Sequence, residues 1–334
     1  MISVTIRGGG FAAACCVRLL TMAGIRPAVE LGERPRVPAI MIGETTQRLL
    51  ADIFDRRDLF DGLHRVHKRI VVWGRNRDPV TLPHSAIVVS EAELMGRLGT
   101  GQKRDDSGDT AENGWTIVTS RAEPAPATVY DFGSRIAEAS AVGLKAGVDS
   151  HACAVESLPN GWLFLLPTGP GCAWLLSVGD RRESLLADSR LVAKQIAAVD
   201  KAVGQFPSHP RITHPLTGAG WLRCGSAALS FDPLCGDGTG HAAREAILGT
   251  AVIRAAGDGA DIHAVTGHYR NRLVAGFRRH LEACREFYES GSRGPWWTHQ
   301  IDEIRRGLQW TAEQLQAVAT PQFRLNGFSL ERID

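Results

Sequence analysis

The 334-residue sequence predicts an α/β fold, in which a domain built on a parallel sheet is interleaved with a smaller β-sheet domain and followed by a helical C-terminus. Three observations predict it. A glycine-rich turn joins a short apolar strand to a helix at the start of the chain. A second glycine-rich stretch, more than two hundred residues later, again leads into a helix. Short strand-like segments separate the two stretches.

The opening residues have the pattern of a βαβ unit. Residues 3–6 alternate as a short buried strand, residues 11–23 place apolar side chains on one helical face, and residues 27–31 form a second strand. The first turn of such a helix has free N–H groups and carries a partial positive charge of about +0.5. The sequence therefore predicts that an anionic group, such as a phosphate, binds there.

The turn itself carries the spacing Gly8-x-Gly10-x-x-Ala13, which is the dinucleotide fingerprint in its Gly/Ala form. Gly8 allows the tight turn, Gly10 lets a pyrophosphate approach the backbone, and Ala13 lets the helix pack close to the strand. An ordinary glycine turn is the alternative. The residues expected to bind the pyrophosphate of a cofactor are Gly8, Gly10, Phe11, Ala12 and Ala13.

The fingerprint also requires an acidic residue after the second strand, where it binds the ribose hydroxyls. Glu30 lies slightly early for this role and Glu33 slightly late. The two residues are three apart, so they face opposite sides of an extended chain. Glu33 is favoured because of its place in a longer motif described below, and Glu30 is then a solvated residue at the strand end.

The second glycine-rich stretch comprises residues 224–227 and 231–240. Two such stretches, each followed by a helix, indicate a long cofactor held at two places. FAD fits, because it has a pyrophosphate in its middle and an isoalloxazine ring at one end. The helix that begins near Gly238 is expected to direct its N–H groups toward the flavin. A flexible surface loop over residues 236–240 is the alternative.

The remaining segments are assigned in chain order. Strands are expected at residues 68–73, 79–82, 115–119, 127–132, 161–166, 173–178 and 221–224, and the strands at 115–119 and 127–132 are expected to join the first sheet. Helices are expected at residues 90–98, 184–203, 241–256, 262–289 and 300–318. The FAD-binding domain is expected to comprise residues 1–60, 85–150 and 205–255, the substrate domain residues 61–84 and 151–204, and the C-terminal helices residues 256–334.

Composition excludes several classes of protein. A net charge of +2 without a basic run argues against nucleic-acid binding. Seven cysteines without a Cys-x-x-Cys pair favour a reducing compartment and no zinc site. No apolar run is long enough to cross a bilayer, and the first strand begins too early for a signal peptide. The sequence therefore predicts a soluble, cytoplasmic protein without a metal.

These segments resemble the FAD-dependent monooxygenase superfamily with the hydroxybenzoate-hydroxylase fold. Within it they resemble the flavin-dependent tryptophan halogenase-like branch, which includes flavoproteins that mature quinoprotein amine oxidases. Residues 33–45 are similar to the halogenase-type segment that ends in a Gly-Glu-Thr turn, and residues 225–240 to the Gly-Asp-Ala…Asp-Pro…Gly-x-Gly segment. The resemblance implies a Rossmann-like FAD-binding domain interleaved with a β-sheet substrate domain. Tyr288 and Trp296-Trp297 are similar to the quinoprotein-maturing branch.

The resemblance assigns cofactor contacts in both segments. It makes Glu33 the ribose acid and residues 43–45 a strap beside the flavin, and it places Ser226 where the family has an aspartate on the ribityl chain. The residues implied to bind FAD, beyond those of the first turn, are Glu33, Gly43, Thr45, Gly225, Ser226, Asp232, Gly238, Thr239 and Gly240.

The resemblance also implies a reaction, in which reduced FAD and oxygen form a flavin hydroperoxide that hydroxylates an aromatic or indole-like substrate. His241 and Glu44 are the candidate catalytic residues. Structural thiol and strap roles are the alternatives for Cys235 and Glu44, and a packing role is the alternative for the aromatic residues. The residues expected to contact the substrate are Trp73, Trp162, Phe164 and Cys235.

Two departures keep other functions open. Cys235 and Gly236 replace the Glu-Ser pair of tryptophan halogenases, and their catalytic lysine has no clean match, which disfavours halogenation. The alternatives are a halogenase-like enzyme, a hydroxylase of a partner protein's side chain, and a flavin-binding protein without oxygenase activity. The substrate is then a small aromatic molecule or a polypeptide. NAD(P)H or a separate flavin reductase supplies the electrons.

Overall fold

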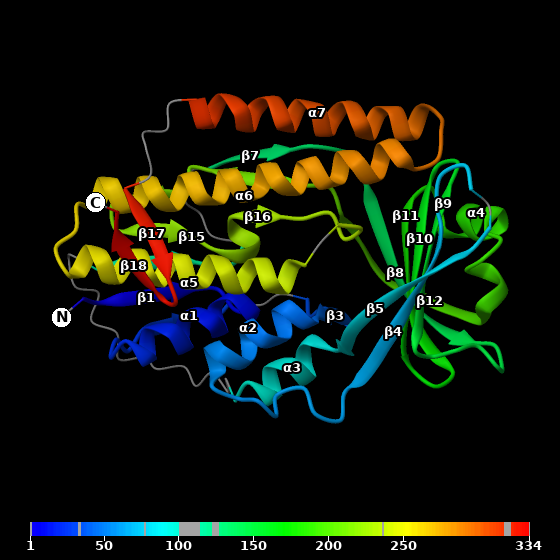
Figure 1. The fold of residues 1–334 in the computed structure, drawn as a ribbon, viewed down its shortest axis with the longest axis horizontal. Helices are drawn as coiled ribbons and strands as arrows, with labels where there is room; N and C mark the ends of the chain where they lie inside the picture. The colour runs from blue at the N-terminus through cyan, green and yellow to red at the C-terminus, as the bar shows by residue number, and fades with distance from the viewer. Residues whose placement is uncertain are drawn as a thin grey trace.

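The computed structural model describes residues 2–32, 35–76, 78–99, 114–121, 127–235, 237–316 and 322–333. Two main sheets organise this part of the chain. Figure 1 shows the larger sheet standing at one end of the molecule, with three long helices running side by side toward it. These helices are α5 (Gly238–Gly257), α6 (Ile262–Ser290) and α7 (Pro295–Gln316).

The smaller sheet confirms the predicted βαβ unit. Its strands lie in the order β14-β15-β6-β1-β2, and β2, β1, β6 and β15 pair in parallel. Arg7, Val118 and Arg223 are aligned across it, so the loops that follow β1, β6 and β15 begin at one edge, where sheets of this kind bind ligands. The strands are β1 (Val4–Arg7), β2 (Ala28–Glu30), β6 (Trp115–Val118), β14 (Thr217–Gly218) and β15 (Trp221–Arg223).

The helices around the smaller sheet are packed through small side chains. Helix α1 (Phe11–Met22) follows β1 and packs along α5, and Ala13, Ala14 and Ala246 are fully buried. Small residues allow this close approach. Two shorter helices, α2 (Glu44–Phe54) and α3 (Glu91–Arg97), follow strands of the larger sheet.

The larger sheet has eight strands in the order β12-β8-β11-β10-β9-β4-β5-β3. Its two faces are distinct, as strand alternation requires. On β10, Leu163 and Leu165 pack in a separate cluster, whereas Trp162 and Phe164 pack against the main core shared with the helices. The strands are β3 (Ile40–Gly43), β4 (His64–Val72), β5 (Val80–Val89), β8 (Ile136–Leu144), β9 (Ala152–Leu158), β10 (Gly161–Gly169), β11 (Cys172–Gly179) and β12 (Ile196–Pro207).

The helix expected over residues 184–203 is wrong. The chain forms only α4 (Arg182–Asp188) and a short 3₁₀ turn (Ala193–Gln195) before β12. The apolar residues Ile196, Val199 and Val203 are spaced three and four apart, which imitates a helical face. Pairing with β8 overrides that pattern, and three register shifts in the pair explain why regular alternation is missing.

One smaller expectation is also wrong. Strand β7 (Thr128–Asp131) does not join the first sheet but pairs with β13 (Arg211–His214), which in turn pairs with β16 (Leu229–Ser230). The C-terminal part is mostly helical, as expected, and β17 (Phe323–Asn326) and β18 (Ser329–Arg332) form a hairpin after α7. Strand β7 and its partner β13 lie far apart in the sequence, so no local pattern predicts their pairing.

Two of the expected domain boundaries fall inside strands of the larger sheet. Strand β5 runs across the boundary at 84/85, β12 runs across the one at 204/205, and β8 lies before the one at 150/151. The larger sheet therefore contains segments that the sequence assigned to the FAD-binding part. No helix in the described ranges is long and apolar enough to cross a membrane.

Candidate cofactor site

The first glycine turn has the geometry that the fingerprint predicts. Gly8 and Gly10 have φ values of 104° and 83°, which favour glycine. A Cβ on Gly8 would lie 2.7 Å from the backbone nitrogen of Ser120, so the turn is pressed against the end of β6. No described side chain caps the N-terminus of α1, so its first N–H groups are available to a ligand. Phe11, Ala12 and Ala13 lie in this turn and are buried.

The second glycine segment meets the first at the start of α1. Gly225 has a φ of 61°, and a Cβ there would lie 2.6 Å from the Cβ of Ala12. Ser226 is exposed, and its hydroxyl donates to the Thr119 carbonyl at 3.3 Å. The structure thus brings residues 8–13 and 225–226 together at the sheet edge, although they are more than two hundred residues apart in sequence.

The two acidic residues considered for the ribose are placed differently. Glu30 ends β2, where its carboxylate forms an ion pair with Arg7 at 2.9 Å. Glu33 lies outside the described residues, so its assignment to the ribose stays a prediction. The pairing of Glu30 with Arg7 agrees with its interpretation as a residue at the strand end.

Arg121 is a site residue that sequence reasoning missed. It is exposed, its Nε donates to the Ser226 carbonyl at 3.2 Å, and its Nη2 donates to the hydroxyl of Ser230. A guanidinium beside a free helix N-terminus suits a pyrophosphate. The available signal was position, because Arg121 closely follows β6 at the same edge of the sheet.

The expected strap is tied to the start of α5. Thr46, buried on the first turn of α2, donates to Asp237 Oδ2 at 2.5 Å. Asp237 Oδ1 also accepts from the Gly240 N–H at 3.0 Å and so caps α5. A Cβ on Gly240 would lie 2.0 Å from Asp237 Oδ2, so a side chain there would displace the Asp237 carboxylate that joins the two segments. One carboxylate therefore joins two segments that are 191 residues apart.

The other strap and α5 residues lie around this junction. Gly43 caps α2, Glu44 and Thr45 are exposed, and Glu44 forms an i,i+4 ion pair with Arg48 at 3.8 Å. Gly238 is exposed and Thr239 is half-buried at the first turn of α5. The roles given to these residues stay predictions, and Gly236 lies outside the described residues.

His241 packs against an aromatic neighbour and stays neutral. Its ring stacks on Phe231 with centroids 3.9 Å apart. Burial, with the nearby Arg244 as a second cause, lowers the pKa of His241 to about 4. A pKa of about 4 makes this imidazole a weak proton acceptor near neutral pH, so the catalytic role given to His241 stays a prediction.

Asp232 lies at the centre of a fully buried polar network. Its carboxylate forms an ion pair with Arg135 at 3.0 Å and accepts from the Tyr288 hydroxyl at 2.9 Å. The Trp162 indole N–H donates to that hydroxyl at 3.1 Å, and Arg135 Nη1 donates to Gln300 at 2.9 Å. The network joins β10, α6 and α7 to the loop before α5, so it fixes the position of that loop.

The aromatic residues expected at the substrate fall into two groups. Trp162 is 1% exposed, and Trp73 packs edge-on against Trp297 while its N–H donates to the Phe287 carbonyl. Phe164 is half-buried and contacts both the main core and the cluster beside the strap strand β3. Cys235 is also half-buried. Trp73, Phe164 and Cys235 are all half-buried and keep surface that a substrate can contact, whereas Trp162 does not.

Glu245 gives a first testable prediction. It is buried on α5, and its Oε2 accepts from the Gly225 N–H at 2.6 Å. Burial raises the pKa of Glu245 to about 8 from an ordinary 4.5. The folded protein then binds this proton more tightly than the unfolded chain. The corresponding stability is complete below about pH 4.5 and is lost as the pH rises to about 8, by on the order of 5 kcal/mol.

We expect Glu245→Gln to remove that pH dependence, because glutamine does not ionise. Urea unfolding at a series of pH values measures it. Glu282→Gln is the control, since Glu282 forms an exposed i,i+4 pair with Arg278 and its removal leaves the slope unchanged. An identical slope in Glu245→Gln and the parent protein would contradict the prediction.

No protein-family model and no curated protein sequence matches this chain. Several solved structures match its fold. The peptidyl tryptophan dihydroxylase QhpG, essential for tryptophylquinone cofactor biogenesis, has 18% identity and a TM-score of 0.72, covering 99% of this chain and 86% of that chain. The flavin-dependent halogenase CmlS has 17% identity and a TM-score of 0.75, covering 92% and 70%. HpxO of Klebsiella pneumoniae, solved with FAD and uric acid, has 15% identity and a TM-score of 0.65, covering 94% of each chain.

The expected fold is thereby confirmed. The chain shares its fold with these solved structures, with a parallel sheet, a larger sheet and C-terminal helices. Among the residues that the structure describes, no group of three or more histidine, cysteine or acidic side chains could hold a metal ion.

Proposed function

We propose that this chain is an FAD-dependent monooxygenase that hydroxylates an aromatic or indole-like group. The observation that carries the proposal is the meeting of the two glycine segments at the uncapped start of α1, with Gly225 against Ala12. The similarity in fold to a peptidyl tryptophan dihydroxylase, and to HpxO solved with FAD and uric acid, supports the same function. When bound, FAD would supply the activation of oxygen, which no amino-acid side chain provides.

The residues present fit this cofactor. The cradle at Gly8 is too tight for any Cβ, and the N–H groups of α1 and the Arg121 guanidinium would hold the pyrophosphate. Residues 43–45 and the start of α5 would hold the flavin end, because the Thr46–Asp237 bond keeps them together. Ser226 offers a hydroxyl without charge, so the site lacks one acid that the family places there.

The chain's own residues would then orient the substrate and move a proton. Phe164 and Cys235 would contact the aromatic group and exclude water from it. Neutral His241 would accept a proton at a ring nitrogen, and Glu44 is the second candidate because it lies in the strap. Electrons would come from NAD(P)H or from a separate reductase.

A polypeptide side chain is a second candidate substrate. It is favoured by the match to the peptidyl tryptophan dihydroxylase, which covers 99% of this chain. Halogenation is the third, because the halogenase CmlS has a similar fold. Hydroxylation of a polypeptide and halogenation would use the same cofactor site. Identifying the substrate and the product therefore distinguishes the two reactions.

The test has two stages. The purified full-length protein, supplied with FAD, should show the visible absorption of an oxidised flavin. Its reduction and exposure to isotopically labelled oxygen, with aromatic compounds or tryptophan peptides, should place one labelled oxygen atom in the product. A halogen atom in the product would favour the halogenase alternative. A bound flavin without any product would favour a binding protein without oxygenase activity, and a protein that takes up no FAD would overturn the proposal.

A further inference from the structure

Arg69 on β4 is a half-buried cation whose neighbours are neutral. Its Nη2 donates to Nε2 of His84 on β5 at 3.3 Å. An arginine only donates, so this nitrogen of His84 accepts, and the neutral imidazole carries its hydrogen on Nδ1. Burial, with the positive charge of Arg69 as a second cause, lowers the pKa of His84, which keeps the ring neutral at pH 7. The imidazole therefore holds the guanidinium without neutralising its charge.

The second neighbour of Arg69 is the thiol of Cys153. The two residues are aligned in the parallel pair of β4 and β9, so their side chains leave the same face of the sheet. Burial raises the pKa of Cys153, and the nearby guanidinium only partly opposes that rise. The thiol keeps its proton and donates it to the Lys68 carbonyl at 3.6 Å. Neither neighbour thus supplies a negative charge to Arg69.

Other arginines that are buried in the same way are paired with acids. Arg7, Arg69 and Arg135 each have a buried Nε without a well-aligned hydrogen bond. Arg7 forms an ion pair with Glu30 at 2.9 Å, and Arg135 forms one with Asp232 at 3.0 Å. Arg69 forms no ion pair with any acid that the structure describes. A partly desolvated charge is costly unless an opposite charge compensates it, which favours an anionic ligand at Arg69.

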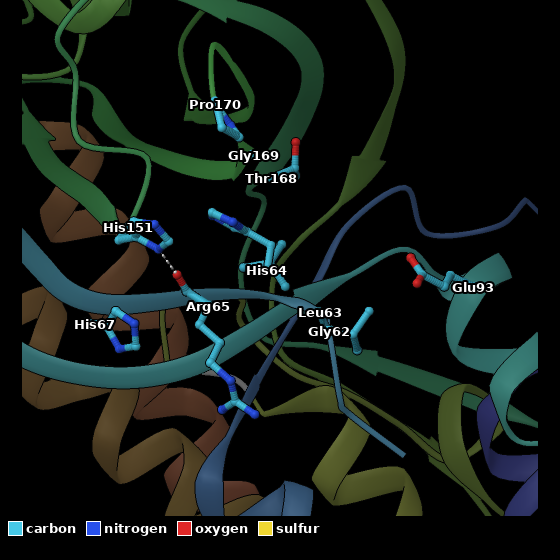
Figure 2. Close-up of a pocket in the computed structure, with 11 residues that line it drawn as sticks. Gly62, Leu63, His64, Arg65, His67, Glu93, His151, Thr168, Gly169 and Pro170 are labelled. Carbon is cyan, nitrogen blue, oxygen red and sulfur yellow. Dashed lines mark hydrogen bonds between the residues drawn. The ribbon is translucent and has the colours of Figure 1, made fainter. Parts of the chain in front are cut away.

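The other cations of β4 lack this combination of burial and missing charge. Lys68 pairs with Asp149 at 3.5 Å, and Arg65 is exposed to solvent. Figure 2 shows Arg65 near the start of the strand, where its guanidinium extends away from His64. Arg69 is therefore the cation of β4 that is both partly buried and without a described acid.

Arg69 lies on the sheet face that carries Phe164. Val71 is aligned with Val155 on β9, and Val155 is aligned with Phe164 on β10, in both cases without a register shift. Arg69 and Val71 alternate along β4, so they share that face. At about 4.8 Å between strands and about 3.3 Å per residue, the Cα atoms of Arg69 and Phe164 lie about 12 Å apart. Because both side chains extend into this interval, a molecule of one or two rings can contact both.

The same pair of residues lies close to the strap. Ala86 on β5 pairs with Gly43, the first residue of the strap. His84 precedes Ala86 by two residues, which is about 7 Å along a strand. Arg69 and His84 therefore lie beside both the segment proposed to hold the flavin and the face that carries Phe164.

We propose that Arg69 binds the carboxylate of an aromatic acid, whose ring lies by Phe164, and that His84 positions the guanidinium. The inference rests on the proposed function and names its substrate class, which is a small aromatic acid and not a neutral aromatic compound. A guanidinium has several N–H donors and binds a carboxylate through two of them at once. The bond to His84 uses one donor and leaves others for the ligand.

Calorimetric binding to the full-length protein, supplied with FAD, tests this assignment without turnover. The probes are two matched pairs, indole-3-acetate with indole-3-acetamide and benzoate with benzamide. We expect at least one acid to bind about tenfold to a hundredfold more tightly than its amide, as for hydrogen bonds to a charged group. We expect Arg69→Gln to remove this preference for the acid and Arg69→Lys to retain part of it.

Further variants separate binding from structure. Arg324→Gln replaces an exposed arginine of the C-terminal hairpin and leaves the preference unchanged. His84→Leu should lower the preference, and His84→Gln should restore much of it, because glutamine can still accept from Arg69. Arg69→Gln removes an uncompensated charge, so its thermal unfolding temperature should not fall below that of the parent.

Three results would overturn the assignment. They are the absence of binding by either acid, equal binding of acids and amides, and a preference for the acid that survives Arg69→Gln. Equal binding would instead favour a neutral substrate, such as a peptide-bonded tryptophan. A lower unfolding temperature in Arg69→Gln would reveal a structural partner of Arg69 and would overturn the assignment as well.

Flavin absorption is measured separately on the same samples. If flavin binds and the preference for the acid is absent, only the assignment of Arg69 fails. If the preference is present and FAD does not bind, the proposed function fails.

Discussion

Replacing Arg135 with methionine is expected to reduce the free energy of unfolding by about 3–5 kcal/mol. Arg135 and Asp232 are both fully buried. In their ion pair at 3.0 Å, Arg135 supplies the positive charge that compensates the Asp232 carboxylate. Methionine fills much of the volume but leaves that carboxylate uncompensated in a dry environment. The Tyr288 hydroxyl still donates to it, but a neutral hydroxyl does not offset the charge. Urea unfolding of parent and variant measures the change.

Two further variants show whether the cause is the buried charge. Arg305→Met removes an exposed arginine that pairs with Glu289 and Asp302, and it should cost less than about 1 kcal/mol. The double variant Arg135→Met/Asp232→Leu removes both buried charges and should recover much of the lost stability. An Arg135→Met variant within about 1 kcal/mol of the parent would contradict the argument. A double variant less stable than Arg135→Met would contradict it as well.

The Arg135 network also shows where sequence reasoning stops. Asp232 was expected to contact FAD, and in the structure its buried carboxylate contacts Arg135 and Tyr288. Nothing local in the sequence points to Arg135, because its partner lies almost a hundred residues away and no local pattern links the two. Trp162 was expected at the substrate, yet its N–H is used inside this network. An aromatic side chain on a strand has the same pattern whether it contacts a ligand or a core.

The elements that were predicted well are those with a local cause. The βαβ unit follows from glycine spacing. The helix expected at residues 90–98 forms as α3, and the Ser90 hydroxyl caps it by accepting from the Glu93 N–H. The strap was expected from a motif, but its bond from Thr46 to Asp237 joins distant segments and needs the folded chain. Strand β12 was mistaken for a helix because its partner β8, and not its own period, determines its structure.

Hydroxylation and halogenation, the two proposed reactions, would both depend on the turn at Gly8, because both would use the same cofactor site. Gly8→Ala is expected to reduce stability by about 2–4 kcal/mol, because it combines a strained backbone with overpacking. Its φ of 104° disfavours any side chain. Its Cβ would lie 2.7 Å from the Ser120 nitrogen, which is backbone and cannot rotate away. Thermal and urea unfolding measure this loss without any cofactor.

Gly9→Ala is the matched control, one residue along the same turn. Its Cβ would meet nothing closer than Leu31 Cδ2 at 3.7 Å, and its φ lies outside the left-handed region. We therefore expect its stability to stay within about 0.5 kcal/mol of the parent. The FAD affinity of Gly8→Ala should fall by on the order of a hundredfold, since the displaced turn no longer presents the α1 N–H groups to the pyrophosphate. Equal stability of the two variants would show that β6 does not press on the turn, and unchanged FAD affinity in Gly8→Ala would show that the pyrophosphate is bound elsewhere.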